Sequence, residues 1–283
     1  MTTIKVCGVP EHFNFPWQRA ILNADFKKIN IDLQWTNVPE GTGKMCQMLR
    51  DSDTDIAVIL TEGIVRDICN GNDSKIVQVF VESPLVWGIH VDAKSTSHQI
   101  SDLENKKVAI SRMGSGSHLM AIVHANQQKW NTKNIDFEIV NNIDGAVVAL
   151  LENRADYFMW EKLMTKPLVD AGIFRQIGEC PTPWPSFVIA VRSNFLEQNQ
   201  AKIKKMLAVL NQCSSDFKKI DGIDIEISEA FKLKTIDVQS WLKKTVWSQK
   251  QILETDFDNV QNQLVALNLI NKSITFAEAT VLL

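Results

Sequence analysis

The stretch VAISRMGSGSHLM, Val108–Met120, decides how this chain is expected to fold. Its β-branched start, Val108–Ile110, is typical of a buried strand, and the apolar residues after the turn recur at helical spacing. The glycines of the turn carry no Cβ, so the backbone there lets a ligand approach closely. Ser115 or Ser117 can cap the helix, whose first N–H groups carry a partial positive charge. The pattern predicts a socket for a carboxylate, sulfonate, phosphate or polar ring edge, or else an ordinary capped strand–turn–helix.

The composition indicates a soluble globular protein with one large or two modest domains. The chain has 283 residues, of which 45% are hydrophobic and 22% are charged, and both values are ordinary for such proteins. The net charge of -3 argues against a general nucleic-acid-binding protein, because phosphate contacts need a basic face. No apolar run approaches the roughly 18–20 residues that cross a bilayer.

Cysteine usage and the first residues both favour a cytoplasmic location. The five cysteines contain no C-x-x-C pair, and their irregular spacing fits reduced thiols better than a disulfide or zinc framework. Residues 1–9 lack the basic and longer apolar regions of a secretory signal and are expected to form the first strand. An exported protein whose signal has been removed is the weaker alternative.

Short strands alternate with helices along most of the chain, which predicts βαβ units and mainly parallel sheets. The expected strands cover residues 4–9, 32–36, 55–60 and 75–81 in a first series, and 107–110, 137–140 and 157–160 in a second. The expected helices cover 16–29, a segment from about 43, 117–129, 144–153 and 161–171. Residues 83–91 and 187–191 are extended segments that leave the first lobe and return to it. The remainder, from residue 193, has the apolar spacing of helices.

This interrupted order resembles the type II periplasmic-binding-protein fold over essentially the whole chain. The resemblance is carried by the Ser-Asp-Leu lead at 101–103, the small-residue turn at 114–117, the Asp-Gly-Ala helix start at 144–146 and the segment ADYFMWE at 155–161. It implies an α/β protein with two lobes, each a mainly parallel sheet flanked by helices. Residues 1–85 and 190–283 would form the first lobe with the C-terminal helices, and residues 90–185 the second, with crossovers near 83–91 and 184–191.

Within that superfamily the chain is most similar to the branch that includes nitrate-, sulfonate- and taurine-binding proteins and the thiamine-pyrimidine proteins. The stretches 111–120, 160–167 and 181–188 resemble a signal-less cytosolic group of the branch that is labelled thiamine-related. The resemblance implies that a ligand sits in an interlobe cleft, at the carboxyl ends of the strands, where open α/β sheets generally bind ligands. The ligand itself does not follow, because this fold hosts many functions.

The candidate ligand-binding residues directly follow expected strands or lie at the crossovers. They are Pro10, Glu11, His12, Gly41, Thr42, Thr61, Glu62, Ser83, Ser111, Arg112, Gly114, Ser115, Gly116, Ser117, His118, Asn141, Trp160, Glu161, Trp184 and Ser186.

Three of these candidates have a structural interpretation beside the functional one. Arg112 could hold an anion through two parallel hydrogen bonds or form a surface ion pair. Trp160 and Glu161 suit a ligand with an aromatic body and a polar edge, but Trp160 could instead complete the core of the second lobe. Trp184 stands between prolines and could be a gate or a packed linker.

Metal and cofactor chemistry find little support in the sequence, and neither a metal nor a cofactor is expected. No two histidines have the i,i+4 spacing of a helix-borne metal site. A G-x-S-x-G nucleophile elbow, a dinucleotide fingerprint and a P-loop are also missing. The fungal enzymes that make the thiamine pyrimidine share the fold, but their cysteine-rich segment has no counterpart here, which argues against the same iron-dependent chemistry.

Two functions from different classes therefore stand. The first is a soluble binding protein whose two lobes close by hinge motion on a small anionic or aromatic heterocyclic molecule, such as a sulfonate, a carboxylate or a thiamine precursor. The second is a cytosolic enzyme of thiamine-pyrimidine or menaquinone-type cofactor biosynthesis, with Glu11, His12 or Glu161 as acid or base. The expected partner is a small molecule; an ABC-transporter permease is not expected without export.

Overall fold

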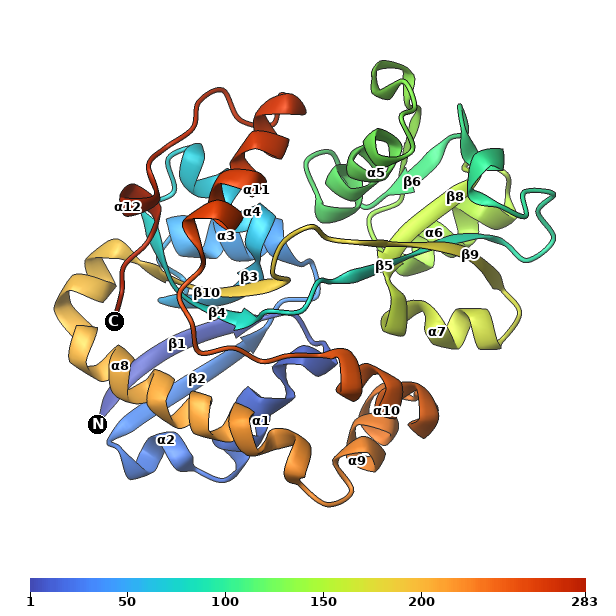
Figure 1. Ribbon diagram of the computed structural model, residues 1–283. Helices are drawn as coiled ribbons and strands as arrows, with labels where there is room; N and C mark the ends of the chain where they lie inside the picture. Colours follow the sequence, from blue (N-terminus) through green and yellow to red (C-terminus); the bar gives the residue numbers. More distant parts are fainter. The chain divides into compact units, whose positions relative to one another are not determined.

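In the computed structural model, which describes residues 1–283, the alternating pattern forms two separate five-stranded sheets (Figure 1). Unit 1 consists of Met1–Ser83 and Trp184–Leu283, and unit 2 of Pro84–Pro183. The chain leaves unit 1 once and returns to it once. The expected α/β fold, with mainly parallel sheets flanked by helices, is confirmed.

The first part of unit 1 alternates strands with helices. Its elements are β1 (Thr2–Gly8), η1 (His12–Asn14), α1 (Phe15–Leu22), α2 (Asp25–Lys28), β2 (Ile31–Asn37), α3 (Thr42–Arg50), β3 (Ile56–Leu60), α4 (Thr61–Cys69) and β4 (Ser74–Val81). The single helix expected over 16–29 is wrong. The chain breaks it into α1 and α2 because Ala24 between them adopts a left-handed conformation, with φ of 55°, which ends a right-handed helix.

The second part of unit 1 contains one strand and most of the helical residues. Its elements are β10 (Phe187–Arg192), α8 (Ser193–Asp216), η4 (Phe217–Lys219), α9 (Ile223–Phe231), α10 (Thr235–Lys244), α11 (Glu254–Ala266) and α12 (Phe276–Ala279). The strand order is β2-β1-β3-β10-β4, in which β10 alone runs antiparallel to its neighbours. Helices α1, α2 and α8 lie on one side of this sheet, and α3, α4 and α11 lie on the other (Figure 1).

Unit 2 repeats the plan with shorter strands. Its elements are β5 (Val86–Asp92), η2 (Ile100–Leu103), β6 (Val108–Ile110), α5 (Gly116–Gln127), η3 (Thr132–Asn134), β7 (Phe137–Ile139), α6 (Ile143–Leu151), β8 (Tyr157–Glu161), α7 (Lys162–Asp170) and β9 (Phe174–Pro181). The strand order is β7-β6-β8-β5-β9, and β5 is the antiparallel strand. Helices α5 and α7 lie on opposite sides of the sheet (Figure 1).

Two further stretches depart from the expected secondary structure, and both lie beside sheet edges. The sequence did not predict the strand β9, which pairs with β5 along the outside of the unit 2 sheet. Residues 245–253 are extended, not helical, and run along β4: Val79 N–H donates to the Lys250 carbonyl at 2.8 Å, and Ser248 N–H to the Phe80 carbonyl at 2.9 Å. Edge strands need hydrogen-bond partners, and these distant segments supply them.

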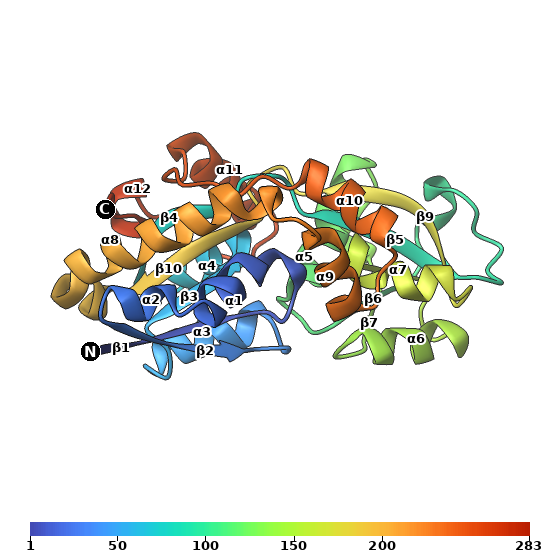
Figure 2. The ribbon, with the colours of Figure 1, turned by 90° about the horizontal axis from the view of Figure 1, so that it is seen from below.

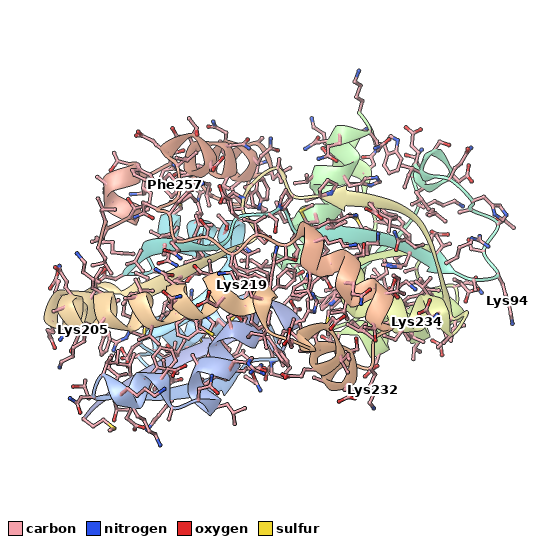
Figure 3. All side chains as sticks on the ribbon, turned by 60° about the horizontal axis from the view of Figure 1, so that its bottom comes forward. Lys94, Lys205, Lys219, Lys232, Lys234 and Phe257 are labelled. Atoms are coloured by element: carbon pink, nitrogen blue, oxygen red, sulfur yellow. The ribbon has the colours of Figure 1, made fainter.

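Helices α9 and α10 form a small helical pair that packs beside α1 and beyond the end of α8 (Figure 2). The pair has its own apolar cluster, made of Phe217, Ile223, Ile227, Val238 and Leu242. The sheet has a separate core that extends to α11, whose fully buried Phe257 packs edge to face on Phe276 (Figure 3). The exposed lysines do not form one cluster along the chain: Lys205 lies on α8, Lys219 on η4, Lys94 in the loop after β5, and Lys232 and Lys234 in the loop between α9 and α10 (Figure 3).

Candidate functional site

The candidate residues of unit 1 gather at one edge of its sheet. Strands β1, β2, β3 and β4 all run in one direction, so their carboxyl ends meet at the same edge, where the antiparallel strand β10 begins. We call this the unit 1 edge. Its candidates are Pro10, Glu11, His12, Gly41, Thr42, Thr61, Glu62, Ser83, Trp184 and Ser186.

The remaining candidates gather in the same way in unit 2. Strands β6, β7, β8 and β9 end together, beside the start of β5. We call this the unit 2 edge. Its candidates are Ser111, Arg112, Gly114, Ser115, Gly116, Ser117, His118, Asn141, Trp160 and Glu161.

The glycine–serine turn of the unit 2 edge is a closed hydroxyl network. Ser115 is the residue that caps α5, since its Oγ accepts from His118 N–H. The Ser117 hydroxyl accepts from Ser111 N–H at 2.9 Å and lies 3.0 Å from Ser115 Oγ. A further contact of 3.3 Å joins the hydroxyls of Ser111 and Ser117. All three serines are buried, so each side chain has local partners that hold the turn in one conformation.

His118 and Arg112 flank this network. The His118 ring is buried, packs edge to face on Phe137 at 4.7 Å, and accepts from Gly114 N–H through Nδ1 at 3.0 Å. A neutral imidazole that accepts at Nδ1 carries its proton on Nε2. Arg112 is half-buried beside the turn, and its guanidinium has a planar set of donors that matches a carboxylate or sulfonate.

The loop after β7 brings backbone to this turn. Asn141 adopts a left-handed conformation with φ of 66°, and its N–H donates to the Ser111 carbonyl at 3.0 Å. Asn142 then caps α6 by accepting from Gly145 N–H. A Cβ at Gly145 would lie 1.9 Å from the Val140 carbonyl oxygen, so this helix start requires glycine.

Glu161 combines burial with a capping role. Its side chain accepts from Met164 N–H at 2.7 Å at the start of α7. Burial raises the pKa of its carboxyl to about 7, against the opposing effect of hydrogen bonds from the first turn of the helix. Its neighbour Trp160 stacks on Phe158 at 5.3 Å and meets Trp87 edge to face. Trp160 therefore packs against the unit 2 core.

Glu62 is the corresponding buried carboxyl of the unit 1 edge. It is 1% exposed and lies in the first turn of α4, where one oxygen, Oε2, accepts from the Trp184 indole at 2.8 Å. The other oxygen, Oε1, is buried without a hydrogen-bond partner. Burial raises the pKa of this carboxyl to about 7, opposed by its own backbone N–H and by Trp184. Trp184 is thus a packed residue that orients a carboxyl.

His12 lies in an aromatic enclosure. It is 0% exposed, and its ring lies 4.5 Å from Phe13, 4.4 Å from Trp241 and 5.7 Å from Phe231. Burial lowers its pKa to about 3, so the imidazole stays neutral near pH 7. The expected role of His12 as an acid or base stays a prediction, now for a fully enclosed, neutral ring. Sequence reasoning missed Trp241 and Phe231, which cover His12 from α10 and α9.

The other candidates of the unit 1 edge hold backbone in place. Thr61 Oγ1 donates to the Pro185 carbonyl at 2.5 Å, and Ser186 Oγ donates to the Ser83 carbonyl. Ser83 Oγ accepts from Val246 N–H at 3.1 Å. Gly41, with φ of 78°, precedes Thr42 at the start of α3, and Glu11 is half-buried.

Other features that could mark a site are metal-ligand groups, disulfides, surface hollows and membrane-spanning helices. No three His, Cys, Asp or Glu side chains group as metal ligands would, and all five cysteines are free thiols. A shallow hollow between α8 and the start of β2 contains none of the candidates; it is lined by Ile29, Asn30, Lys205, Ala208, Val209 and Gln212. No helix is both long and apolar enough to span a membrane.

Comparisons with known proteins agree with this architecture. The model of the Ca3427-like periplasmic-binding-protein (PBP) family matches residues 87–180. The Candida albicans CA3427 gene product, which defines a family with the generic periplasmic-binding-protein fold, is similar at 25% identity, with a TM-score of 0.88 over 97% of this chain and 92% of that one. Comparison with curated proteins finds no match.

Two sulfonate-binding proteins share the fold at lower identity. The alkanesulfonate-binding protein SsuA from Xanthomonas axonopodis pv. citri, bound to MOPS, is 15% identical, with a TM-score of 0.84 over 100% of this chain and 99% of that one. The aliphatic sulphonate-binding SsuA from Escherichia coli is 16% identical, with a TM-score of 0.77 over 99% and 92%. The expected resemblance to the type II periplasmic-binding-protein-like family is confirmed, and the central segment is similar to Ca3427-like proteins.

Proposed function

We propose that this protein binds a small molecule through the unit 1 and unit 2 edges, with the two lobes closing on the ligand. The observation that carries the proposal is that every candidate lies at the carboxyl-end edge of its own sheet, which is where open α/β sheets generally bind ligands. Function does not follow from fold alone, so the side chains at those edges have to supply the ligand chemistry.

A sulfonate or carboxylate is the first ligand class to test. The start of α5 offers backbone N–H groups with a partial positive charge, and Arg112 adds a permanent cation beside them. The similar SsuA of Xanthomonas axonopodis is bound to MOPS, which makes MOPS a suitable probe. Thiamine precursors and other aromatic heterocycles complete the panel.

Isothermal titration calorimetry with MOPS, taurine, benzoate and thiamine precursors tests this proposal. We expect at least one probe to bind wild-type protein and to bind Arg112→Ala about tenfold more weakly, since a lost charge-assisted bond is worth about that factor. Arg154→Ala is the matched control, because Arg154 pairs on the surface of unit 2 with Glu138 and Glu152. Equal affinity of both variants would show that Arg112 does not contribute to ligand binding. Binding of no probe would overturn the proposal.

A second candidate function is an enzyme of cofactor biosynthesis. It is favoured by the two buried carboxyls, Glu62 and Glu161, whose pKa values of about 7 suit acid–base catalysis near neutral pH. Incubation with thiamine-pyrimidine or menaquinone precursors, followed by mass spectrometry, separates the two functions. Recovery of a bound precursor unchanged and in stoichiometric amount supports binding, whereas turnover that Glu161→Gln abolishes supports the enzyme.

A cytoplasmic location is part of this proposal. Its support is chemical: all five thiols are free, and four of them are buried, as suits a reducing compartment. Fractionation of cells that express the tagged protein tests the point. Recovery of the protein outside the cytoplasm would overturn it.

A further inference from the structure

Several buried polar atoms at or beside the unit 1 edge lack hydrogen-bond partners. They are Glu62 Oε1, both ring nitrogens of His12 and the indole Nε1 of Trp241. At the unit 2 edge none of the candidate side chains is in this state, and the indole Nε1 of Trp87, at the start of β5, is the one unpartnered atom beside them. An unpartnered buried polar atom costs free energy, and native proteins contain few of them. A group of them at one edge therefore calls for a partner that the chain does not supply.

Glu62 is held so that one buried oxygen remains without a partner. Its Oε2 is occupied by the Trp184 indole at 2.8 Å, and the backbone before it is tied to the 184–186 segment through Thr61. Gly63 lets the start of α4 approach Thr42, since a Cβ there would lie 2.1 Å from the threonine methyl group. These contacts fix the carboxyl, so Oε1 is an acceptor in a set position.

Aromatic rings gather at the same edge of the sheet as this oxygen. His12 and Glu62 follow β1 and β3, which are neighbours in the sheet. The Phe13 ring lies 5.1 Å from Phe187 and 5.3 Å from Trp241, so rings line the edge between the elements that carry the unpartnered atoms. Aromatic walls with a few fixed polar atoms are the usual lining of a site for a flat organic ligand.

We propose that the unit 1 edge recognises the amidine-like edge of a planar nitrogen base, with Glu62 Oε1 accepting a hydrogen bond from its N–H group. This inference rests on the proposed binding function and names the ligand class. A carboxylate only accepts hydrogen bonds, whereas a carboxylic acid also donates one. An amidine is a cation near neutral pH that donates to the carboxylate form. A ring nitrogen beside an amino group can match either form by gaining or losing a proton, but a sulfonate or carboxylate can match only the protonated carboxyl.

The test compares two nitrogen bases with an anion of similar size. Benzamidine, 2-aminopyridine and benzoate are titrated into wild-type protein and Glu62→Gln. The glutamine oxygen can still accept from Trp184, while its amide nitrogen replaces the acceptor Oε1 by a donor. We expect the two nitrogen bases to bind wild type and to bind Glu62→Gln about tenfold more weakly, and benzoate affinity not to fall.

Asp55→Asn is the matched control, because Asp55 is a buried carboxyl of unit 1 at the opposite end of β3, paired with Arg192. It should leave the affinity for the nitrogen bases unchanged, and circular dichroism checks that each variant is folded. Equal binding of the nitrogen bases to Glu62→Gln overturns the inference. Binding of benzoate or MOPS alone to wild type overturns it too but preserves the proposed function, and binding of no probe overturns both.

Discussion

The unit 1 and unit 2 edges carry the same kinds of side chain, yet they differ in how those side chains are satisfied. Each edge has a buried glutamate at the start of the helix that follows its central parallel strand, with a pKa raised to about 7 by burial. Glu161 caps its own helix, and the serines beside it bond to one another. Glu62 keeps one oxygen without a partner, as His12 does with both nitrogens.

This difference suggests separate roles for the two edges: the unit 2 edge is held in one conformation, and the unit 1 edge has atoms that a ligand can pair with. A satisfied polar network holds one conformation and stabilises the fold, so the unit 2 edge is a preformed surface. Unpartnered buried atoms destabilise the unliganded protein, and a ligand that forms hydrogen bonds with them gains affinity. Removing a polar group should therefore cost stability in unit 2 and cost little, or increase stability, in unit 1.

The largest effect is expected from Glu62→Gln. The folded pKa of about 7 lies above the ordinary value of 4.5, so the folded state holds a proton that the unfolded state releases. Stability is then fully present below about pH 4.5 and is lost as the pH rises through 7. Glu62→Gln removes this loss and should raise the free energy of unfolding by about 1 kcal/mol at pH 5 and about 3 kcal/mol at pH 8.

Urea unfolding of wild type and Glu62→Gln at both pH values checks this gain. The comparison at one pH cancels the effects of the other titrating groups, Glu161 and the buried histidines included. A gain of the same size at pH 5 and pH 8 would contradict the raised pKa of Glu62.

An intermediate effect of opposite sign is expected from Ser117→Ala in unit 2. The substitution removes the acceptor of Ser111 N–H and leaves that buried donor unsatisfied, which should lower the free energy of unfolding by about 2 kcal/mol. Urea unfolding measures the loss, and Ser273→Ala, at an exposed serine, should show none. A negligible loss for Ser117→Ala would mean that the network does not stabilise unit 2.

The smallest effect is expected from His12→Phe. The aromatic packing against Phe13, Phe231 and Trp241 is kept, while two unpartnered nitrogens are removed. We expect a change within about 1 kcal/mol, in the stabilising direction. Thermal unfolding without ligand measures it, and a loss as large as that of Ser117→Ala would abolish the contrast between the two edges.

The sequence was sufficient for the features that depend on local pattern. Alternating strands and helices predicted two mainly parallel sheets, and the rule that ligands meet the carboxyl ends of strands led to the candidate residues. Residues such as Gly114 and Ser115 were found because a turn between a strand and a helix has a short-range signal.

The sequence failed where partners lie far apart along the chain. It left β9 unassigned, because an outer strand with alternating polar residues has a weak signal. It predicted helix over residues 245–253, which instead follow β4. It also had no signal for Trp241, which meets His12 only after α10 has packed against the loop beyond β1.

Local periodicity and turn chemistry, which the sequence contains by itself, determined the two sheets and the edge at which each set of candidates lies. Only the tertiary structure decided which polar atoms find partners, because burial and hydrogen bonding join side chains such as Glu62 and Trp184 that are distant in the chain. The same glutamate at the start of a helix is therefore a cap in unit 2 and an available acceptor in unit 1.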